Sequence, residues 1–207
     1  MFCHKNIKDL GFEEYNYKDI QFGKKLGNGA NGEVHKCRIK DKSYAIKRIF
    51  TEWIQTKTDR KNFDKDLYDE LIVCSKIKGY KRIMEVYGIC YTEDDVFIIS
   101  EILDNRGCLH NFINLHYLGY NDRLNIFKSI LLAVQQLHRN DVVHGDLKME
   151  NMAYYYDPIE LKDYVKLIDF NTSYIINDND EYDIPFLHGT YGYCAIEQHR
   201  GKINKKS

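Results

Sequence analysis

The segment LGNGANGEVHKC (residues 26–37) carries three glycines, Gly27, Gly29 and Gly32, in the spacing GxGxxGxV. Glycine lets a backbone approach a polyphosphate closely and present N–H donors that a side chain would block. In a dinucleotide-binding unit a helix begins after the third glycine, whereas the residues that follow here, EVHKCRIK, read as a strand. Taken alone, the segment also fits a flexible β-turn. In its context it predicts a strand–loop–strand hairpin that covers phosphates.

The rest of the chain predicts a β-rich first part and a helix-led second part. Strand patterns occupy residues 20–26, 33–40, 43–50, 83–91 and 96–102, and a helical pattern occupies 63–77. Beyond 103–107, helices are expected over 108–115 and 122–138, and a strand over 164–170. Asp122 is the expected N-cap of the longer helix. The apolar face of that helix is predicted to contain Leu124, Phe127, Ile130, Leu131, Val134 and Leu137.

Composition narrows the class of protein. The 207 residues suffice for one sizeable core or two small lobes, and 43% hydrophobic with 29% charged residues is ordinary for a globular protein. Thirty basic against 31 acidic residues leave a net charge of -1, so neither a nucleic-acid binder nor a membrane binder is expected. No apolar run approaches the ~18 residues of a membrane span.

The predicted location is the cytoplasm. The N-terminus lacks a signal peptide, and the six cysteines form no CxxC pair, which fits a reducing compartment better than a disulfide framework or a zinc site. The bias toward Asn, Lys and Tyr would place the chain in a host cytoplasm if its source were a virus or an intracellular parasite.

A lysine interrupts the apolar run YAIKRI. Lys47 is either an outward-facing residue of an edge strand or a cation directed at the α- and β-phosphates of a nucleotide. A buried lysine needs a counter-ion, and the helix over 63–77 offers Glu70, Asp66 and Asp69. Glu70 is preferred because it adjoins the apolar stripe of that helix.

The segment VVHGDLKMEN (142–151) places an acid, a base and an amide in one loop. Asp146 can accept a hydrogen bond from an attacking hydroxyl, Lys148 can neutralise charge on a phosphoryl group, and Asn151 offers a hard oxygen suited to Mg²⁺. Asp169, at the end of YVKLIDF, can reach metal ions that bridge phosphates. Each residue alone fits an ordinary polar loop, but together they supply the charges that phosphoryl transfer requires.

The ordered set of motifs resembles the eukaryotic-type protein kinase family. The set comprises GxGxxGxV at 27–34, Ala45-Ile46-Lys47, Glu70, HGDLKxxN at 144–151, Asp169-Phe170-Asn171 and GTYGYCAIE at 189–197. Lys148 together with Thr190 resembles the serine/threonine type. The resemblance implies an α+β, two-lobed protein-kinase-like fold with a β-rich N-lobe and a shortened helical C-lobe. It implies an N-terminal extension over 1–19, an N-lobe over 20–102 and a partial C-lobe over 103–207.

The resemblance also implies the roles of individual residues. The catalytic set is Asp146, Lys148, Lys47 and Glu70, and the metal ligands are Asn151 and Asp169. ATP and Mg²⁺ are the implied cofactors. Ser100 would be the gatekeeper before the hinge. The implied ATP-binding residues are Leu26, Gly27, Asn28, Gly29, Ala30, Asn31, Gly32, Glu33, Val34, Ala45, Lys47, Glu101, Leu103 and Ala153.

The chain departs from the family pattern at four places. Gly145 replaces the arginine that normally binds an activation-segment phosphate, so activity is expected to be independent of phosphate on Thr172, Ser173 or Thr190. Asn171 replaces a glycine, and asparagine tolerates left-handed backbone. Ile196 replaces a proline. The sequence ends at Ser207, so Glu197 is expected to be exposed or differently paired, and a partner protein or self-association is expected to cover the C-lobe.

Three functions remain open. The first is ATP-dependent transfer to Ser/Thr hydroxyls of protein substrates by a reduced-size serine/threonine-protein kinase. The second is a catalytically weak or inactive kinase-like interaction module. The third is a small-molecule phosphotransferase, because HGDL with a downstream IDF also resembles aminoglycoside and choline kinases.

Overall fold

The computed structural model describes residues 7–29, 32–103, 107–176, 181–184 and 189–207. They divide into two compact units. The first contains Met1–Lys78 and Glu85–Asp104, and the second contains Gly79–Met84 and Asn105–Ser207. The first unit consists mainly of strands, and the two α-helices that follow residue 100 lie in the second unit. The fold is therefore of the α+β class predicted from the sequence.

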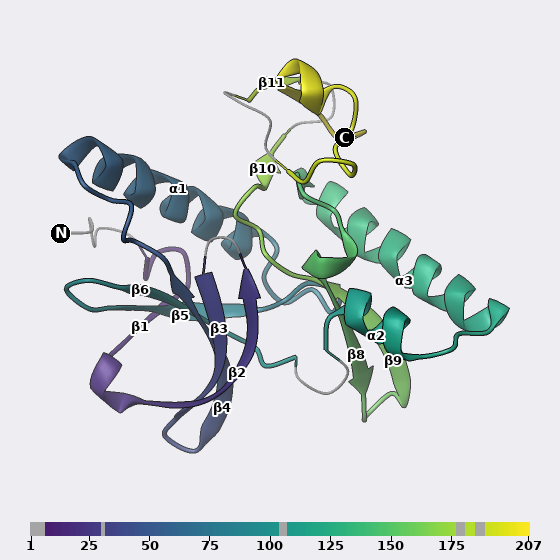
Figure 1. The fold of residues 1–207 in the computed structure, drawn as a ribbon, viewed down its shortest axis with the longest axis horizontal. Coiled ribbons are helices and arrows are strands. Elements are labelled where there is room, and N and C mark those ends of the chain that lie inside the picture. The colour runs from purple at the N-terminus through teal and green to yellow at the C-terminus, as the bar shows by residue number, and fades with distance from the viewer. Residues whose placement is uncertain (1–6, 30–31, 104–106, 177–180, 185–188) are drawn as a thin grey trace. The chain divides into compact units, whose positions relative to one another are not determined.

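The first unit is built on a sheet that has six strands in its described part, in the order β1-β5-β6-β4-β3-β2 (Figure 1). The strands are β1 (Glu13–Tyr15), β2 (Ile20–Gly29), β3 (Gly32–Ile39), β4 (Lys42–Ile49), β5 (Val86–Tyr91) and β6 (Val96–Ser100), and the short helix η1 (Tyr17–Asp19) precedes β2. Neighbours pair antiparallel, except that β1 pairs parallel with β5. Strand β1 was missed because three residues carry too little pattern.

The pairing register gives the sheet two different faces, because residues directly opposite each other on paired strands point the same way. Ile46 pairs with Ile99 and belongs to a cluster of buried residues: Ile20, Cys37, Ile39, Ile46, Cys90, Phe97 and Ile99. The opposite face carries Val34, Lys47 and Ala45, since Val34 pairs with Lys47 and Ala45 follows on the same face of β4. One face is therefore core, and the other carries the predicted nucleotide residues.

Helix α1 (Lys57–Lys76) lies beside this sheet in Figure 1. It begins earlier than the apolar pattern predicted, because Thr56 and Asp59 form a capping box: Asp59 N–H donates to Thr56 Oγ1 at 3.1 Å, and Thr56 N–H donates to Asp59 Oδ2 at 2.9 Å. Its buried residues, which anchor the helix, are Phe63, Leu67, Leu71, Val73 and Cys74.

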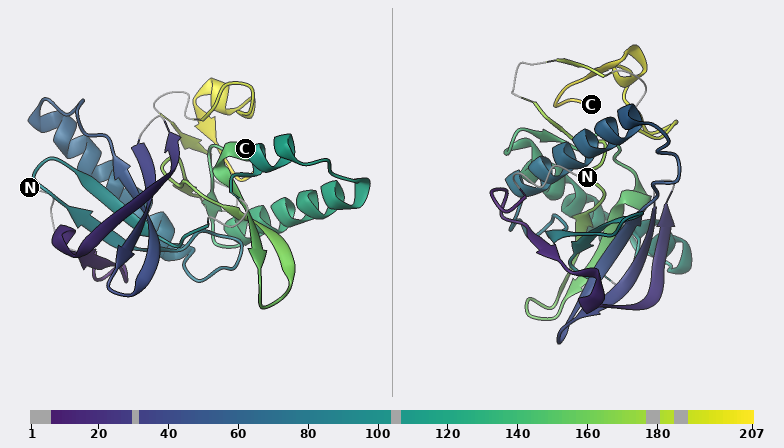
Figure 2. Two further views of the ribbon diagram at one scale, coloured as in Figure 1. Left: turned by 60° about the horizontal axis from the view of Figure 1, so that its bottom comes forward. Right: turned by 90° about the vertical axis from the view of Figure 1, so that its left-hand side faces the viewer.

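The second unit combines two helices with a hairpin. Helices α2 (Leu109–Leu115) and α3 (Tyr120–His138) precede β7 (Val142–Val143), η2 (Met149–Asn151), β8 (Met152–Asp157) and β9 (Lys162–Leu167). Strands β8 and β9 pair antiparallel, with Met152 opposite Leu167 at one end and Asp157 opposite Lys162 at the other. Figure 2 shows this hairpin beside the helices. Ser129 Oγ on α3 accepts the Val165 N–H at 2.9 Å, which ties α3 to β9.

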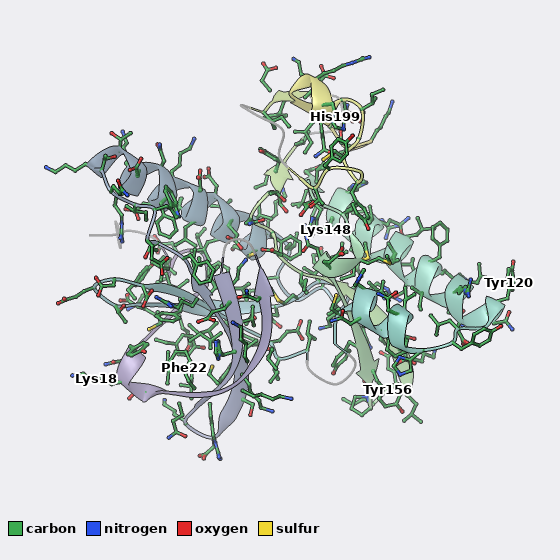
Figure 3. All side chains as sticks on the ribbon, in the orientation of Figure 1. Lys18, Phe22, Tyr120, Lys148, Tyr156 and His199 are labelled. Carbon is green, nitrogen blue, oxygen red and sulfur yellow. The ribbon has the colours of Figure 1, made fainter. Side chains whose placement is uncertain are left out.

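The prediction for the apolar face of α3 was right for Leu137, which is buried, and wrong for three other residues. The buried residues of α3 are Ile126, Ser129, Ala133 and Leu137, whereas Leu124, Phe127 and Leu131 are about half exposed. Tyr120, which Figure 3 labels in the first turn, is also exposed. Two faces of α3 carry helically spaced apolar residues, and periodicity alone does not say which one is covered. Asp122 is not the N-cap either: Gly119 is, and its N–H donates to Asp122 Oδ2 at 3.1 Å.

The last described segments pack against β7. They are β10 (Tyr174–Ile175), β11 (Tyr182–Asp183), η3 (Gln198–Arg200) and β12 (Lys202–Ile203). β10 pairs with β7 and β11 pairs with β12, both antiparallel. Val143, Ile176, Ile184 and Ile203 form one buried cluster, so residues on both sides of the GTYGYCAIE motif share a core with β7.

Candidate active site

The glycine-rich segment is a hairpin, as the strand pattern after Gly32 predicted. Gly27 pairs with Val34, Asn28 with Glu33 and Gly29 with Gly32, while the predicted ligand residues Ala30 and Asn31 lie outside the described residues. A Cβ on Gly32 would lie 2.2 Å from Arg48 O, so only glycine fits there. A Cβ on Gly27 would meet nothing within 4 Å, which leaves open space for a close ligand.

Glu33 in this hairpin has a structural partner. Its carboxylate binds Lys25 Nζ at 2.8 Å, and this hydrogen bond holds the pKa of Glu33 below its ordinary value. A carboxylate would repel a phosphate. We therefore expect Glu33 to stabilise the base of the hairpin through its side chain and to meet a nucleotide only through its backbone.

Further predicted nucleotide-site residues lie on strands β3, β4 and β6 or directly after β6. Ala45 pairs with Ser100 and Lys47 pairs with Val34, so the four share one face of the sheet. Ser100 and Ala45 are buried, and Lys47 is half-buried. After β6, Glu101 N–H donates to Glu85 O, and Glu85 N–H donates to Glu101 Oε1, both at 2.8 Å. These bonds fix the start of the segment that leads to Leu103.

The three acids considered as partners of Lys47 differ in exposure. Asp66 and Asp69 on α1 are exposed, whereas Glu70 is partly buried, next to the buried Leu71. A partly buried carboxylate is the better counter-ion for a half-buried lysine, because less water screens the pair. The preference for Glu70 therefore keeps its physical basis, and the pair stays a prediction.

In the second unit, His144 anchors the catalytic loop. Its ring is 1% exposed and packs 5.2 Å from the ring of Phe170. Burial lowers the pKa of His144, so the imidazole is neutral. The two ring nitrogens then have distinct roles: Nε2–H donates to Ile168 O at 3.1 Å, and Nδ1 accepts the Asp146 N–H at 3.4 Å. The ring thus links the loop to the end of β9.

Asp146, Lys148, Asn151 and Thr190 lie together around one carboxylate (Figure 3 labels Lys148). Asp146 Oδ2 accepts hydrogen bonds from Asn151 Nδ2 at 2.9 Å and from Lys148 Nζ at 2.7 Å. Lys148 Nζ also donates to Thr190 Oγ1 at 2.6 Å. Oδ1 of Asp146 is buried and has no hydrogen-bond partner among the described residues. One oxygen is therefore held, and the other is left for a further donor.

The charge state of Asp146 follows from these contacts. Burial alone would raise its pKa, but the side chains of Lys148, Thr190 and Asn151 together outweigh burial and hold the pKa below its ordinary value. Asp146 is consequently a carboxylate at neutral pH. Such a group orients a hydroxyl well and is a weak base until the hydroxyl itself becomes acidic.

Asn151 and Asp169 form the predicted metal pair. Ile168 N–H donates to Asn151 O at 3.0 Å, so the backbones next to both residues adjoin. The Asn151 nitrogen faces Asp146, which leaves its carbonyl oxygen for a cation. No group of three or more His, Cys, Asp or Glu suited to a metal occurs in the described part of the chain. The oxygen donors of Asn151 and Asp169 fit Mg²⁺, which takes one or two protein ligands together with phosphates and water.

The left-handed backbone near Asn171 lies at a residue for which no conformation was predicted. The positive φ is at Asp169 (64°), and Asn171 is absent from the described non-glycine residues with positive φ. The glycine-to-asparagine change at 171 therefore needs no left-handed conformation. Ala153, one of the implied ATP-binding residues, is buried on β8 and bridges to Cys108.

Gly145 is required by the local backbone. Its φ is 81°, and a Cβ would lie 2.1 Å from Thr172 O, so the arginine expected from the resemblance does not fit here. The neighbouring His144 O accepts hydrogen bonds from Thr172 Oγ1 at 3.2 Å and Ser173 Oγ at 2.9 Å. The His144 carbonyl is thus held by uncharged groups.

Glu197 is differently paired, as one of the two expectations stated: its Oε1 accepts a hydrogen bond from Ser207 Oγ at 2.8 Å. Lys205 Nζ binds Asp141 Oδ1 at 2.8 Å, which fixes the same segment beside the loop after α3. Sequence reasoning missed Gln198, whose side chain is buried and contacts Gly145 O. No motif marks it, and only the tertiary contact reveals it.

Comparisons with known proteins agree with this geometry. A model of the protein kinase domain matches residues 20–205. The chain is 35% identical over 169 residues to "Probable serine/threonine-protein kinase fhkA" of Dictyostelium discoideum, covering 79% of this chain and 28% of that one. It is 29% identical over 178 residues to human "Calcium/calmodulin-dependent protein kinase type IV", covering 85% and 35%.

A third relative is "Probable serine/threonine-protein kinase KIN1 homolog" of Enterocytozoon bieneusi (strain H348), 32% identical over 135 residues, with 65% of this chain and 21% of the relative covered. The chain thus spans about a fifth to a third of the length of these relatives. Within the described residues, no helix is long and apolar enough to cross a membrane. The family match, the ordered motifs and the geometry around Asp146 together show that this chain belongs to the protein kinase family.

Proposed function

We propose that the chain transfers the γ-phosphoryl group of ATP to Ser or Thr hydroxyls of protein substrates. The observation that carries this proposal is the carboxylate of Asp146, with Oδ2 held by Lys148 and Asn151 and Oδ1 buried without a hydrogen-bond partner among the described residues. A hydroxyl donor satisfies such an oxygen, whereas leaving it empty costs free energy. The serine/threonine kinases to which the chain is similar support a protein substrate.

The residues of this chain would divide the work as follows. Asp146 accepts the hydrogen bond of the incoming hydroxyl and takes its proton late in transfer. Lys148 holds Asp146 and places a positive charge beside the transferred group. Asn151 and Asp169 would hold Mg²⁺, which would neutralise charge on the phosphates of ATP. Lys47, oriented by Glu70, would bind the α- and β-phosphates.

The test compares purified wild type with Asp146→Asn in the presence of Mg²⁺ and ATP, on protein substrates. The exposed Asp41→Asn is a charge-matched control, because its side chain is 99% exposed. Transfer by wild type and Asp41→Asn, with at least about a hundredfold loss in Asp146→Asn, is expected. Equal transfer by all three proteins would contradict the proposed role of Asp146.

The interaction-module alternative keeps one observation in its favour. Tyr120, Leu124, Phe127 and Leu131 follow the i, i+4, i+7, i+11 spacing along one exposed face of α3. A helical seam of this kind is suited to a partner protein or a second copy of the chain. Nucleotide binding without phosphoryl transfer, together with oligomerisation in analytical ultracentrifugation, would favour that alternative. Transfer to small hydroxylated acceptors but to no protein would favour a small-molecule phosphotransferase.

We further propose that activity does not depend on phosphate in the activation segment. Gly145 has no side chain to bind a phosphate, and the hydroxyls of Thr172 and Ser173 already donate to His144 O. Phosphate on either residue would remove a hydrogen-bond donor from His144 O and add negative charge beside that carbonyl. Phosphatase treatment is therefore expected to leave turnover within about twofold, as measured by phosphate incorporation; a loss of activity would contradict this.

A further inference from the structure

We propose that Gln198 is a positioning residue that fixes the catalytic loop through the carbonyl of Gly145. The proposal rests on the phosphoryl-transfer function proposed above, and it assigns a role to a residue outside the kinase motifs. Gln198 lies in η3, just after the GTYGYCAIE segment, and is 3% exposed. A fully buried amide at this position must satisfy its hydrogen-bonding groups inside the protein.

Both ends of the Gln198 side chain are used. Nε2 donates to Gly145 O at 2.9 Å, and Oε1 accepts the Ala195 N–H at 2.9 Å. One amide therefore joins the loop that contains the base to the segment that contains Thr190. Gly145 directly precedes Asp146, so the orientation of its carbonyl sets the backbone from which the Asp146 side chain projects.

The surroundings are shaped for this contact. Gly189 has φ 113°, and a Cβ there would lie 2.9 Å from Gly145 O and 3.5 Å from Gln198 Nε2. A side chain at 189 would crowd the carbonyl and its donor. Glycines at 145 and 189 thus let the two segments approach closely enough for the amide of Gln198 to bridge them.

The two backbone carbonyls before Asp146, those of His144 and Gly145, are held by different side chains. Gly145 O is bound by Gln198, while His144 O is bound by Thr172 and Ser173. Two consecutive peptide groups are consequently fixed by side chains from elsewhere in the unit. A displacement of about 1 Å at a catalytic group can cost about a hundredfold in rate, so losing one of these contacts is expected to lower turnover.

Two variants separate positioning from general stability. Gln198→Met keeps the length and volume of the side chain but removes both hydrogen bonds. Gln198→Glu replaces the side-chain amide by a carboxyl group. The protonated carboxyl can still donate to Gly145 O and accept from Ala195 N–H. The ionised carboxylate instead places a negative charge against the Gly145 carbonyl. Burial raises the pKa of such a carboxyl, which brings the change of state into the range of the assay.

The experiment measures kcat, KM for ATP and KM for a protein substrate at pH 6 and pH 8. Gln135→Met and Gln135→Glu, at an exposed position of α3, are the controls. We expect Gln198→Met to lower kcat by about ten- to a hundredfold, with a smaller change in KM for ATP. The kcat of Gln198→Glu, relative to wild type at the same pH, should be at least about threefold higher at pH 6 than at pH 8.

Hydrogen exchange of residues 142–151 supplies a readout that needs no activity. The proposal expects faster exchange in this segment for Gln198→Met than for wild type and Gln135→Met. If wild type transfers no phosphate, the proposed function fails, and the exchange result alone decides the role of Gln198. Unchanged exchange, or kcat within about twofold of wild type with parallel pH profiles, would overturn the proposal.

Discussion

Replacing Gly145 by alanine tests the central feature of the catalytic loop. A non-glycine residue in left-handed conformation costs roughly 1–2 kcal/mol, and Gly145 has φ 81°. The added Cβ would also lie 2.1 Å from Thr172 O, where real contacts are not below 3.0 Å. The Thr172 backbone would therefore have to move by about 1 Å.

That movement sets the size of the effect. It would weaken the two hydrogen bonds that Thr172 and Ser173 donate to His144 O, each worth about 1 kcal/mol. Together with the backbone strain, the loss of unfolding free energy should be about 3–4 kcal/mol. For a chain of this size we expect a fall in Tm of about 10 °C.

Gly192→Ala is the matched control. Gly192 has φ 90°, but a Cβ there meets nothing within 4 Å, so alanine brings strain without a collision. Its expected cost is about 1–2 kcal/mol, or about 4 °C in Tm. Differential scanning fluorimetry or urea titration measures both variants. Equal losses for Gly145→Ala and Gly192→Ala would refute the collision argument, and a neutral Gly145→Ala would refute the whole account of this loop.

Three further perturbations test other parts of the molecule. Lys47→Met should lower turnover by at least about a hundredfold while the Tm changes little, because the lysine is expected to act on phosphates; comparable losses of folding and activity would indicate a structural lysine. Phe127→Ser should cost the isolated chain less than about 1 kcal/mol in urea titration, because Phe127 is 58% exposed, whereas Leu137→Ala on the same helix should cost about 2–5 kcal/mol. His138 has a lowered pKa, first from burial and then from Lys205, so the unfolded state binds its proton more readily. The unfolding free energy should therefore fall as pH drops below about 6.5, and His138→Gln should lose part of that slope; an unchanged slope would contradict the burial of this ring.

The hairpin, the order of strands and helices, and the clustering around Asp146 could be predicted from sequence because each depends on local pattern or on motif spacing. Helix α1 could also have been placed more accurately, since Thr56 and Asp59 have the spacing of a capping box. Strand β1 could not, because its three residues are ordered by pairing with β5.

The misassigned face of α3 has a different origin. The buried residues Ile126, Ala133 and Leu137 recur at helical spacing, and so do the exposed Phe127 and Leu131. Of the buried set, only Leu137 was predicted. The choice between them depends on which neighbours the helix meets, and that information is distributed over β7, β9 and the rest of the unit. Tertiary contacts decide the covered face, so a single-sequence pattern leaves it open.

Because glycine replaces the family's arginine at position 145, different contacts hold the loop before Asp146. The arginine of the family pattern would bind an added phosphate. Here the carbonyls of His144 and Gly145 accept three neutral hydrogen bonds instead, from Thr172, Ser173 and Gln198. At about 1 kcal/mol each, their sum is comparable to the coupling free energy of many regulatory switches. Contacts of this kind form with the fold and need no added charge. On the proposed function, the loop is then organised whenever the chain is folded, and changing the hydroxyls or the amide is the direct way to disorganise it.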